Sequence, residues 1–191
     1  MLQTFQGLLN LVRANVINAP VENINPASVE VTLGNRFYVE RISPVWVVTD
    51  DTKASDIFVN LHRKENAKFD LVELNPGCKL VLKPGAFVLA ETVEEFNLPN
   101  DIVAEYVLKS SQARNGWGHL LAGYADPGWH NSRLTMEFKN YSQDQYLTVE
   151  PGQKCGQMKF YLVDEVPEDK SYRVVGQYNN QTSVTASKGI R

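Results

Sequence analysis

Apolar residues recur every three or four positions at the start of the chain. The positions are Leu2, Phe5, Leu8, Leu9 and Val12. This spacing places them on one face of a helix, with polar residues on the other. The pattern predicts one short amphipathic helix over residues 1–15.

After Pro20 the helical spacing gives way to strict alternation of apolar and polar residues. Val29, Val31 and Leu33 alternate with polar neighbours and then meet Gly34, which is typical of a strand that ends in a turn. Similar runs follow at Leu80/Leu82, Phe87/Leu89, Leu134/Met136/Phe138 and Met158/Phe160/Leu162. Pro-Gly pairs at 76–77, 84–85, 127–128 and 151–152 lie between these runs and favour tight turns. The pattern predicts a mainly β protein, either a sandwich or a barrel.

Two parts of the chain lack this alternation. Residues 40–70 have the weakest pattern, and we expect solvated loops around one short strand there. Residues 176–191 are polar and have too little apolar surface to fold alone, so we expect a flexible C-terminal segment that is either disordered or ordered by what it covers. The length and the continuity of the pattern predict a single domain over residues 1–191.

Composition and charge narrow the range of functions. The chain is 43% hydrophobic and 21% charged, which is typical of a globular protein with a real core. A net charge of −3 disfavours a nucleic-acid polymer as partner, because such partners usually select a basic surface. The longest unbroken apolar run, Ala86–Ala90, is far shorter than the roughly 20 residues that cross a membrane. We therefore expect neither a nucleic-acid nor a membrane partner.

The cysteines and the N-terminus favour a cytoplasmic protein. Cys78 and Cys155 lie far apart and form no C-x-x-C pair, which fits reduced thiols. The first residues lack the positive charge of a signal peptide, and Arg13 interrupts the apolar stretch early.

The histidines do not have the spacing of zinc ligands. His62, His119 and His130 form no H-E-x-x-H motif, and neither H-x-E nor P-C-x-x-C occurs. Each is expected to be a surface residue or a satisfied interior residue. The chain also lacks G-x-S-x-G, a Walker A sequence and G-x-G-x-x-G. Because the histidines lack the spacing of metal ligands, we expect no metal ion held by protein side chains.

Candidate chemistry gathers between residues 109 and 138. Lys109, Ser110, Ser111 and Arg114 combine two cations with two hydroxyl groups, a set that suits phosphate oxygens but would also fit a solvated turn.

Two carboxylates in the same region also have two interpretations each. Glu137 lies within an alternating strand, so its carboxylate is either a solvent-facing charge or a general base on a pocket wall. Asp126 precedes Pro127-Gly128 and is a natural turn initiator, which is the alternative to a binding role.

Taken together, these segments resemble the dCTP deaminase family, which has the trimeric dUTPase-like fold. Residues 109–116 match the phosphate motif G-R-S-S-x-x-R-x-G from its second position, and residues 122–129 match A-[HG]-x-[IV]-D-P-G-[WF] apart from Ala125. Met136-Glu137 resembles the end of the catalytic strand. Further likeness covers nearly the whole chain except residues 40–70. The resemblance implies a distorted, jelly-roll-like β-barrel that assembles as a homotrimer with sites between subunits.

The resemblance also implies hydrolytic deamination of dCTP to dUTP and ammonia without zinc, which would supply dUTP for dUMP and dTTP synthesis. Glu137 would take a proton from the water that attacks C4 of cytosine and later return it to the leaving amine. Ser110 and the backbone carbonyl of Ala122 would hold the water. Arg114 would stabilise the developing charge.

The remaining binding roles follow from the same resemblance. Asp126 would read the deoxyribose 3′-hydroxyl, and the backbone at Thr135 and Met136 would contact the base. The triphosphate, accompanied by Mg²⁺, would be held at Lys109, Ser111, Tyr172, Gln177 and Gln181, with Gln112 and Ala113 in the same segment.

Departures from the family pattern leave alternatives open. Lys109 replaces an Arg, Gln177 replaces a Lys, and Leu121 replaces a Thr, so a different phosphate number or a modified cytosine is an alternative substrate. Gly123 stands where single-activity members commonly have His and members that also form dUMP and pyrophosphate commonly have Gly. A bifunctional enzyme is thus an alternative.

Two rival functions complete the sequence-based set. A dUTPase without deaminase activity is disfavoured, since Pro127-Gly128-Trp129 stands where dUTPases carry Tyr-Arg-Gly. A silent nucleotide sensor is disfavoured because Glu137, Ser110 and Arg114 occur together.

Overall fold

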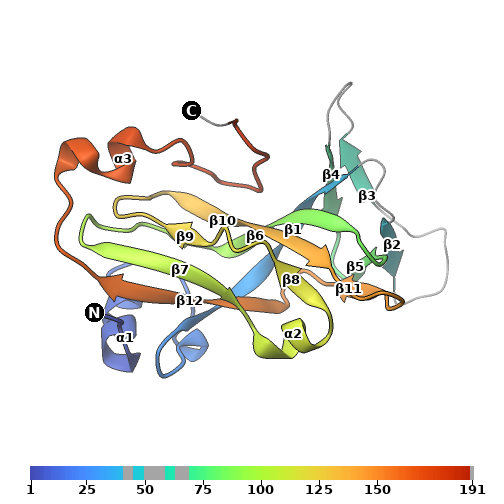
Figure 1. Ribbon diagram of the computed structural model, residues 1–191, viewed down its shortest axis with the longest axis horizontal. Coiled ribbons are helices and arrows are strands. Elements are labelled where there is room, and N and C mark those ends of the chain that lie inside the picture. The colour runs from blue at the N-terminus through green and yellow to red at the C-terminus, as the bar shows by residue number, and fades with distance from the viewer. Residues whose placement is uncertain (41–44, 50–58, 63–68, 190–191) are drawn as a thin grey trace.

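The computed structural model describes residues 1–40, 45–49, 59–62 and 69–189 (Figure 1). The helices are α1 (Phe5–Arg13), α2 (Ser110–Arg114) and α3 (Tyr172–Val175), with short 3-10 turns η1 (Val21–Asn23) and η3 (Glu168–Lys170). The strands are β1 (Val29–Glu40), β2 (Val45–Thr49), β3 (Val59–His62), β4 (Phe69–Leu74), β5 (Cys78–Leu82), β6 (Phe87–Phe96), β7 (Ile102–Leu108), β8 (Trp117–His119), β9 (Tyr124–Ala125), β10 (Ser132–Asn140), β11 (Leu147–Val149) and β12 (Lys154–Leu162). The mainly β prediction is confirmed, and α1 lies within the predicted helix.

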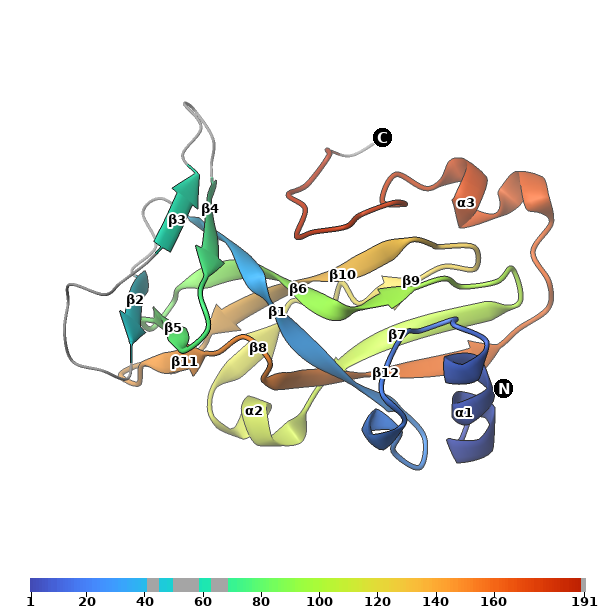
Figure 2. The same cartoon turned by 180° about the vertical axis from the view of Figure 1, so that it is seen from behind.

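All named strand pairs are antiparallel and form two sheets. The larger sheet runs β8-β10-β6-β1-β12-β7-β9, with β4 also pairing with β1 and β3 pairing with β4. The smaller sheet runs β11-β5-β2 and lies at the opposite end of the molecule from α1 (Figures 1 and 2). The register of β1 shifts between Val31 and Thr32 and again between Leu33 and Phe37, so one strand pairs with β12 in its first half and with β4 and β6 in its second. These shifts let the sheet curl.

Residues 40–70 contain more strand than the sequence predicts. Both β2 and β3 lie in this region, where we expected one short strand among loops. The rest of that prediction falls on residues 41–44, 50–58 and 63–68, which lie outside the described residues.

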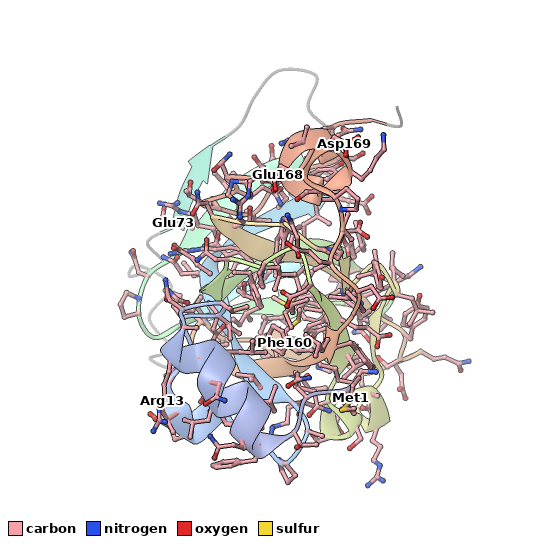
Figure 3. The ribbon with its side chains drawn as sticks, turned by 90° about the vertical axis from the view of Figure 1, so that its left-hand side faces the viewer. Met1, Arg13, Glu73, Phe160, Glu168 and Asp169 are labelled. Carbon is pink, nitrogen blue, oxygen red and sulfur yellow. The ribbon has the colours of Figure 1, made fainter. Side chains whose placement is uncertain are left out.

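The core occupies the inside of the curled sheet. Strand β10 alternates buried and half-buried residues along its whole length, as its sequence pattern predicts. Phe37, Phe96 and Phe160 are among the largest fully buried side chains. In Figure 3, Phe160 lies in the interior, between Met1 and Arg13 at the lower end and Glu168 and Asp169 beside α3 at the upper end.

Replacing a central core side chain should destabilise the fold strongly. Phe37→Ala is expected to lower the free energy of unfolding by about 3–5 kcal/mol, because it leaves a cavity between β1 and its neighbours. Urea unfolding measures the change. Phe5→Ala, at a half-exposed position on α1, is the matched control and should cost much less. Equal losses for the two variants would contradict this placement of the core.

The chain after β12 returns over the sheet as a C-terminal segment, defined here as residues 176–189. It follows α3 and runs along the β10 side of the sheet in both views (Figures 1 and 2). Trp129 Nε1 donates to the carbonyl of Tyr178 at 2.7 Å, and Asn180 N donates to the carbonyl of His130 at 3.2 Å. The predicted polar tail is therefore ordered over the domain, and its flexibility stays a prediction.

A tight turn makes this return possible. Gly128 has φ of +88°, a backbone conformation that favours glycine, and a Cβ there would collide with the hydroxyl of Ser171. Beside it, the N–H of Tyr172 donates to the carbonyl of Pro127 at 2.9 Å. The Pro-Gly turn thus packs directly against the start of α3.

Candidate active site

A pocket of about 610 Å³ opens between β10 and the C-terminal segment. Its volume is within the range of small-molecule sites. Polar lining comes from Asp126, Thr135, Glu137, Tyr172, Tyr178, Gln181, Thr185 and Ser187, and apolar lining from Phe69, Phe87, Leu89, Ala122, Tyr124, Ala125, Trp129 and Leu134. The pocket therefore combines an apolar wall with a few convergent polar groups.

Strand β10 presents Glu137 to this pocket. Its neighbours Met136 and Phe138 are buried in the core, so the alternation of the strand turns the Glu137 carboxylate to the opposite face. That face is the pocket wall, and the side chain is only 23% exposed. Of the two sequence-based interpretations, the pocket placement is the one observed. Leu89 lies directly opposite Glu137 on β6.

His119 approaches the Glu137 carboxylate from strand β8. Its Nε2 lies 3.2 Å from Glu137 Oε2, although the angle falls outside hydrogen-bond geometry and neither atom has a hydrogen-bond partner within the described residues. The ring packs against Tyr106 with centroids 4.5 Å apart, and the side chain is 4% exposed. His119 is not among the site residues that the sequence predicts. The strand pairing reveals the contact, because His119 on β8 lies opposite Phe138, the residue next to Glu137 on β10.

The loop from Leu121 to Asp126 forms one side of the pocket. Leu121 has φ of +61° and is 94% exposed, an unusual combination for an apolar residue. Gly123 packs against β7, where the N–H of Tyr106 donates to the Gly123 carbonyl at 2.8 Å. Partial desolvation raises the pKa of the Asp126 carboxyl above its usual value, although the residue as a whole is exposed. This strained loop therefore carries a partly desolvated carboxyl to the pocket.

The C-terminal segment forms one wall of the pocket. Tyr178, Gln181, Thr185 and Ser187 all contribute to its lining, and Gln181 is buried. Gln177 is placed differently: it is half-buried and does not line the pocket, and its carbonyl accepts from Lys188 Nζ at 2.6 Å.

The phosphate-motif residues, 109–116, lie away from this pocket. They form α2 and its ends, on the opposite side of the molecule from α3 and the C-terminal segment in both views (Figures 1 and 2). Ser110, Ser111 and Arg114 are exposed, whereas Lys109 forms an ion pair with Glu30. Gln112 Nε2 donates to the carbonyl of Lys154 at 3.1 Å.

The sequence-predicted site residues thus fall into two groups within one chain. The pocket brings together Ala122, Asp126, Thr135, Glu137, Tyr172 and Gln181. The second group is formed by Lys109, Ser110, Ser111, Gln112, Ala113 and Arg114 on α2. Met136 is fully buried in the core, so only its backbone is available to the pocket side.

Comparison with known proteins decides the family. Residues 4–163 match the family model described as dCTP deaminase-like. The chain belongs to the dCTP deaminase-like family. A relative from Dictyoglomus turgidum, named dCTP deaminase, dUMP-forming, is 33% identical over 174 residues, which cover 90% of this chain and 84% of the relative. A relative of the same name from Coprothermobacter proteolyticus is 33% identical over 88% of this chain and 84% of the relative.

A solved structure supports the same fold. The 2′-deoxycytidine 5′-triphosphate deaminase of Agrobacterium tumefaciens superposes with a TM-score of 0.62 at 20% identity, over 84% of this chain and 48% of that one. The resemblance stated from the motifs and the predicted fold class are therefore confirmed. The family match ends at residue 163, before the C-terminal segment that lines one side of the pocket.

Two further observations describe this dCTP deaminase-like chain. Within the residues that the structure describes, no group of three His, Cys, Asp or Glu side chains is arranged to hold a metal ion. Over the same residues, no helix is long and apolar enough to cross a membrane.

Proposed function

We propose that this enzyme deaminates dCTP and carries the product on to dUMP and pyrophosphate. The observation that carries the proposal is the Glu137 carboxylate on the wall of a nucleotide-sized pocket, in a chain about one-third identical to proteins named dCTP deaminase, dUMP-forming. These names favour the bifunctional alternative over our expectation of dUTP as the final product. Gly123 agrees with the same alternative.

Deamination requires one group that moves a proton twice. Glu137 removes a proton from water as the water oxygen bonds to C4 of cytosine. The protonated carboxyl then gives this proton to the amine as the C4–N bond breaks and ammonia leaves. The second proton of the water ends on N3 as the C4 hydroxyl becomes the uracil carbonyl. The half-buried position of Glu137 on the pocket wall limits competing water and holds the carboxylate in one place.

The other site residues have binding roles in this proposal. The backbone carbonyl of Ala122 holds the water together with Ser110, and Arg114 stabilises the developing charge. Asp126 accepts from the 3′-hydroxyl of the deoxyribose, while the backbone at Thr135 and Met136 contacts the base. The triphosphate is held at Lys109, Ser111, Gln112, Ala113, Tyr172, Gln177 and Gln181.

We infer that each site is shared between neighbouring subunits of a homotrimer. In one chain, α2 lies on the opposite side of the molecule from α3 and the C-terminal segment (Figure 1), and none of its residues lines the pocket that holds Glu137. A neighbouring subunit that places its α2 at the pocket mouth completes the site. Light scattering tests this assembly, and a monomer at assay concentration would contradict it.

Mg²⁺ is expected to enter with the triphosphate, because phosphate oxygens are among its preferred ligands. When bound it neutralises phosphate charge, and Lys109 and Arg114 supply the remaining positive charge from the protein. Gln177 adds no positive charge, so among the proposed phosphate-binding residues it contributes hydrogen bonds only.

Product analysis is the direct test. Wild-type protein is incubated with dCTP and Mg²⁺, and the nucleotides are separated by chromatography while ammonia and pyrophosphate are measured. We expect dUMP, pyrophosphate and ammonia in equal amounts. Accumulation of dUTP alone would contradict the second step. Binding of dCTP without turnover would favour the silent nucleotide sensor.

The ion pair between Lys109 and Glu30 gives a separate prediction. Glu30 holds the lysine that the substrate phosphates would need, and it also lies 3.9 Å from Lys154 Nζ. Because a partly exposed ion pair contributes up to about 1 kcal/mol, Glu30→Gln should lower the KM for dCTP by a factor of up to about 5. Steady-state kinetics at low salt measures it. Glu73→Gln, which removes a comparable partner of Arg36, is the control and should leave KM unchanged. A higher KM in Glu30→Gln would contradict a phosphate role for Lys109.

A further inference from the structure

A second carboxylate, Glu91, is buried beside the pocket and has no part in the proposed chemistry. It lies on β6 directly opposite Thr135 of β10, one step along the same face from the pair formed by Leu89 and Glu137. Its exposed fraction is 1%. A buried carboxylate is costly unless it has partners, so the contacts of Glu91 indicate what it does.

The main partner of Glu91 is the backbone of the C-terminal segment. The N–H of Val184 donates to Glu91 Oε2 at 2.7 Å, a short charge-assisted hydrogen bond. Glu91 Oε1 lies 3.6 Å from Arg133 Nη1. Burial raises the pKa of the carboxyl, whereas the bonds from Val184 and Ser183 and the charge of Arg133 oppose the rise. The two largest of these opposing effects come from the C-terminal segment, and the charges of Arg133 and Arg36 add to them.

The opposite side of the Glu91 side chain is fitted to its neighbour strand. A Cβ at Gly34 on β1 would lie 2.5 Å from Glu91 Cγ, so any larger residue at 34 would displace the side chain. Glu91 is therefore confined between β1 and the C-terminal segment, with its Oε2 directed to Val184.

The bond to Val184 lies between two residues that line the pocket. Gln181 and Thr185 flank it, and each is held by a neutral contact: the Gln181 carbonyl accepts from Arg133 N at 2.8 Å, and Thr185 N donates to Thr135 Oγ1 at 3.1 Å. The Val184 side chain itself is buried. Among these contacts, the bond to Glu91 is the one made to a carboxylate.

We propose that Glu91 is a positioning residue that holds residues 181–185 over the pocket before a nucleotide binds. The proposal rests on the proposed function in that the pocket receives a nucleotide. A segment that is already ordered costs less entropy when the ligand arrives, so Glu91 acts on affinity and leaves the chemical step to Glu137. Loss of the carboxylate should therefore raise KM more than it changes kcat.

Hydrogen exchange of the backbone amides of residues 181–185, measured without nucleotide, tests the positioning directly. Glu91→Leu removes the acceptor and should speed their exchange by a factor of about 10–100, the change expected for loss of one charge-assisted hydrogen bond. Glu91→Gln retains a neutral acceptor and should restore most of the protection. Glu95→Leu is the matched control, since Glu95 lies on the same strand and contacts the same Arg133, with its Oε1 3.4 Å from Arg133 Nε.

Kinetics with dCTP gives the second readout. Glu91→Leu should raise KM at least about tenfold with kcat within about threefold of wild type, and Glu95→Leu should change neither. Unchanged exchange in Glu91→Leu, or equal acceleration in Glu95→Leu, would overturn the proposal. So would a KM unaffected by faster exchange.

A variant in the segment itself covers the case in which Glu91→Leu fails to fold. Val184→Pro removes the donor instead of the acceptor and leaves β6 intact, so it should reproduce both effects. If a folded Val184→Pro protein exchanges its remaining amides in residues 181–185 as slowly as the wild type, the proposal is overturned. Because exchange is measured without substrate, absence of dCTP turnover in the wild type would count against the proposed function alone.

Discussion

Glu137→Gln is expected to lower the turnover of dCTP by about 10³–10⁴-fold. General acid–base groups contribute about 10²–10⁴-fold to rate, and here one carboxylate both removes and returns the proton. The amide matches the carboxylate in shape, so the pocket and the contact with His119 should persist. Initial rates of ammonia release measure the loss.

The matched control is Glu105→Gln, which removes a charge from an exposed pair with Lys159 at 2.6 Å, away from the pocket lining. It should retain wild-type turnover. Binding of dCTP to Glu137→Gln, measured by calorimetry, should remain within a few-fold of wild type. If Glu137→Gln keeps more than about a tenth of the activity, another group carries the proton. His119 would then be the first residue to test.

Two inactive variants are expected to restore activity to each other. Arg114→Ala and Glu137→Gln should each be nearly inactive alone, because one lacks the charge-stabilising cation and the other the proton carrier. A site shared between subunits needs Arg114 from one chain and Glu137 from the next. Each mixed trimer therefore has about one third of its sites intact, against about one quarter over the whole random mixture. Co-expression with two different affinity tags, followed by rate measurement on the doubly tagged assembly, gives the result.

A double variant is the control for complementation. Protein with both Arg114→Ala and Glu137→Gln, co-assembled with Glu137→Gln, has no intact carboxylate and should stay inactive. If the two single variants also fail to complement while forming mixed assemblies, the shared-site arrangement is wrong. Activity in the mixture would show that α2 of one chain completes the pocket of the next, since α2 does not line the pocket of its own chain.

Much of the fold follows from local pattern. The alternation in β10 predicted both its burial and the face on which Glu137 lies, because a strand turns successive side chains to opposite sides. Residues 40–70 were harder, since β2 and β3 are only five and four residues long and their pairing with β5 and β4 depends on distant segments.

The site was predictable only where a motif carried it. Contacts made by pairing register were not, and His119 meets Glu137 because β8 pairs with the end of β10. Glu91 was missed for a related reason. Its partner Val184 is 93 residues away and contributes a backbone N–H, which no side-chain pattern reveals.

The close packing at Gly123 also bears on how activities in this family could change over time. A Cβ at this position would lie 2.6 Å from Tyr106 Cβ and 3.1 Å from the Tyr106 carbonyl oxygen. Substitution by His alone would therefore force β7 and β9 apart. A lineage with this packing cannot reach the His form by changing residue 123 in isolation. Because the nearest atoms are the Cβ, Cα and carbonyl oxygen of Tyr106, a shorter side chain at 106 would not relieve the contact, and the loop or β7 has to shift first. Sterics thus constrain the evolutionary order of the substitutions.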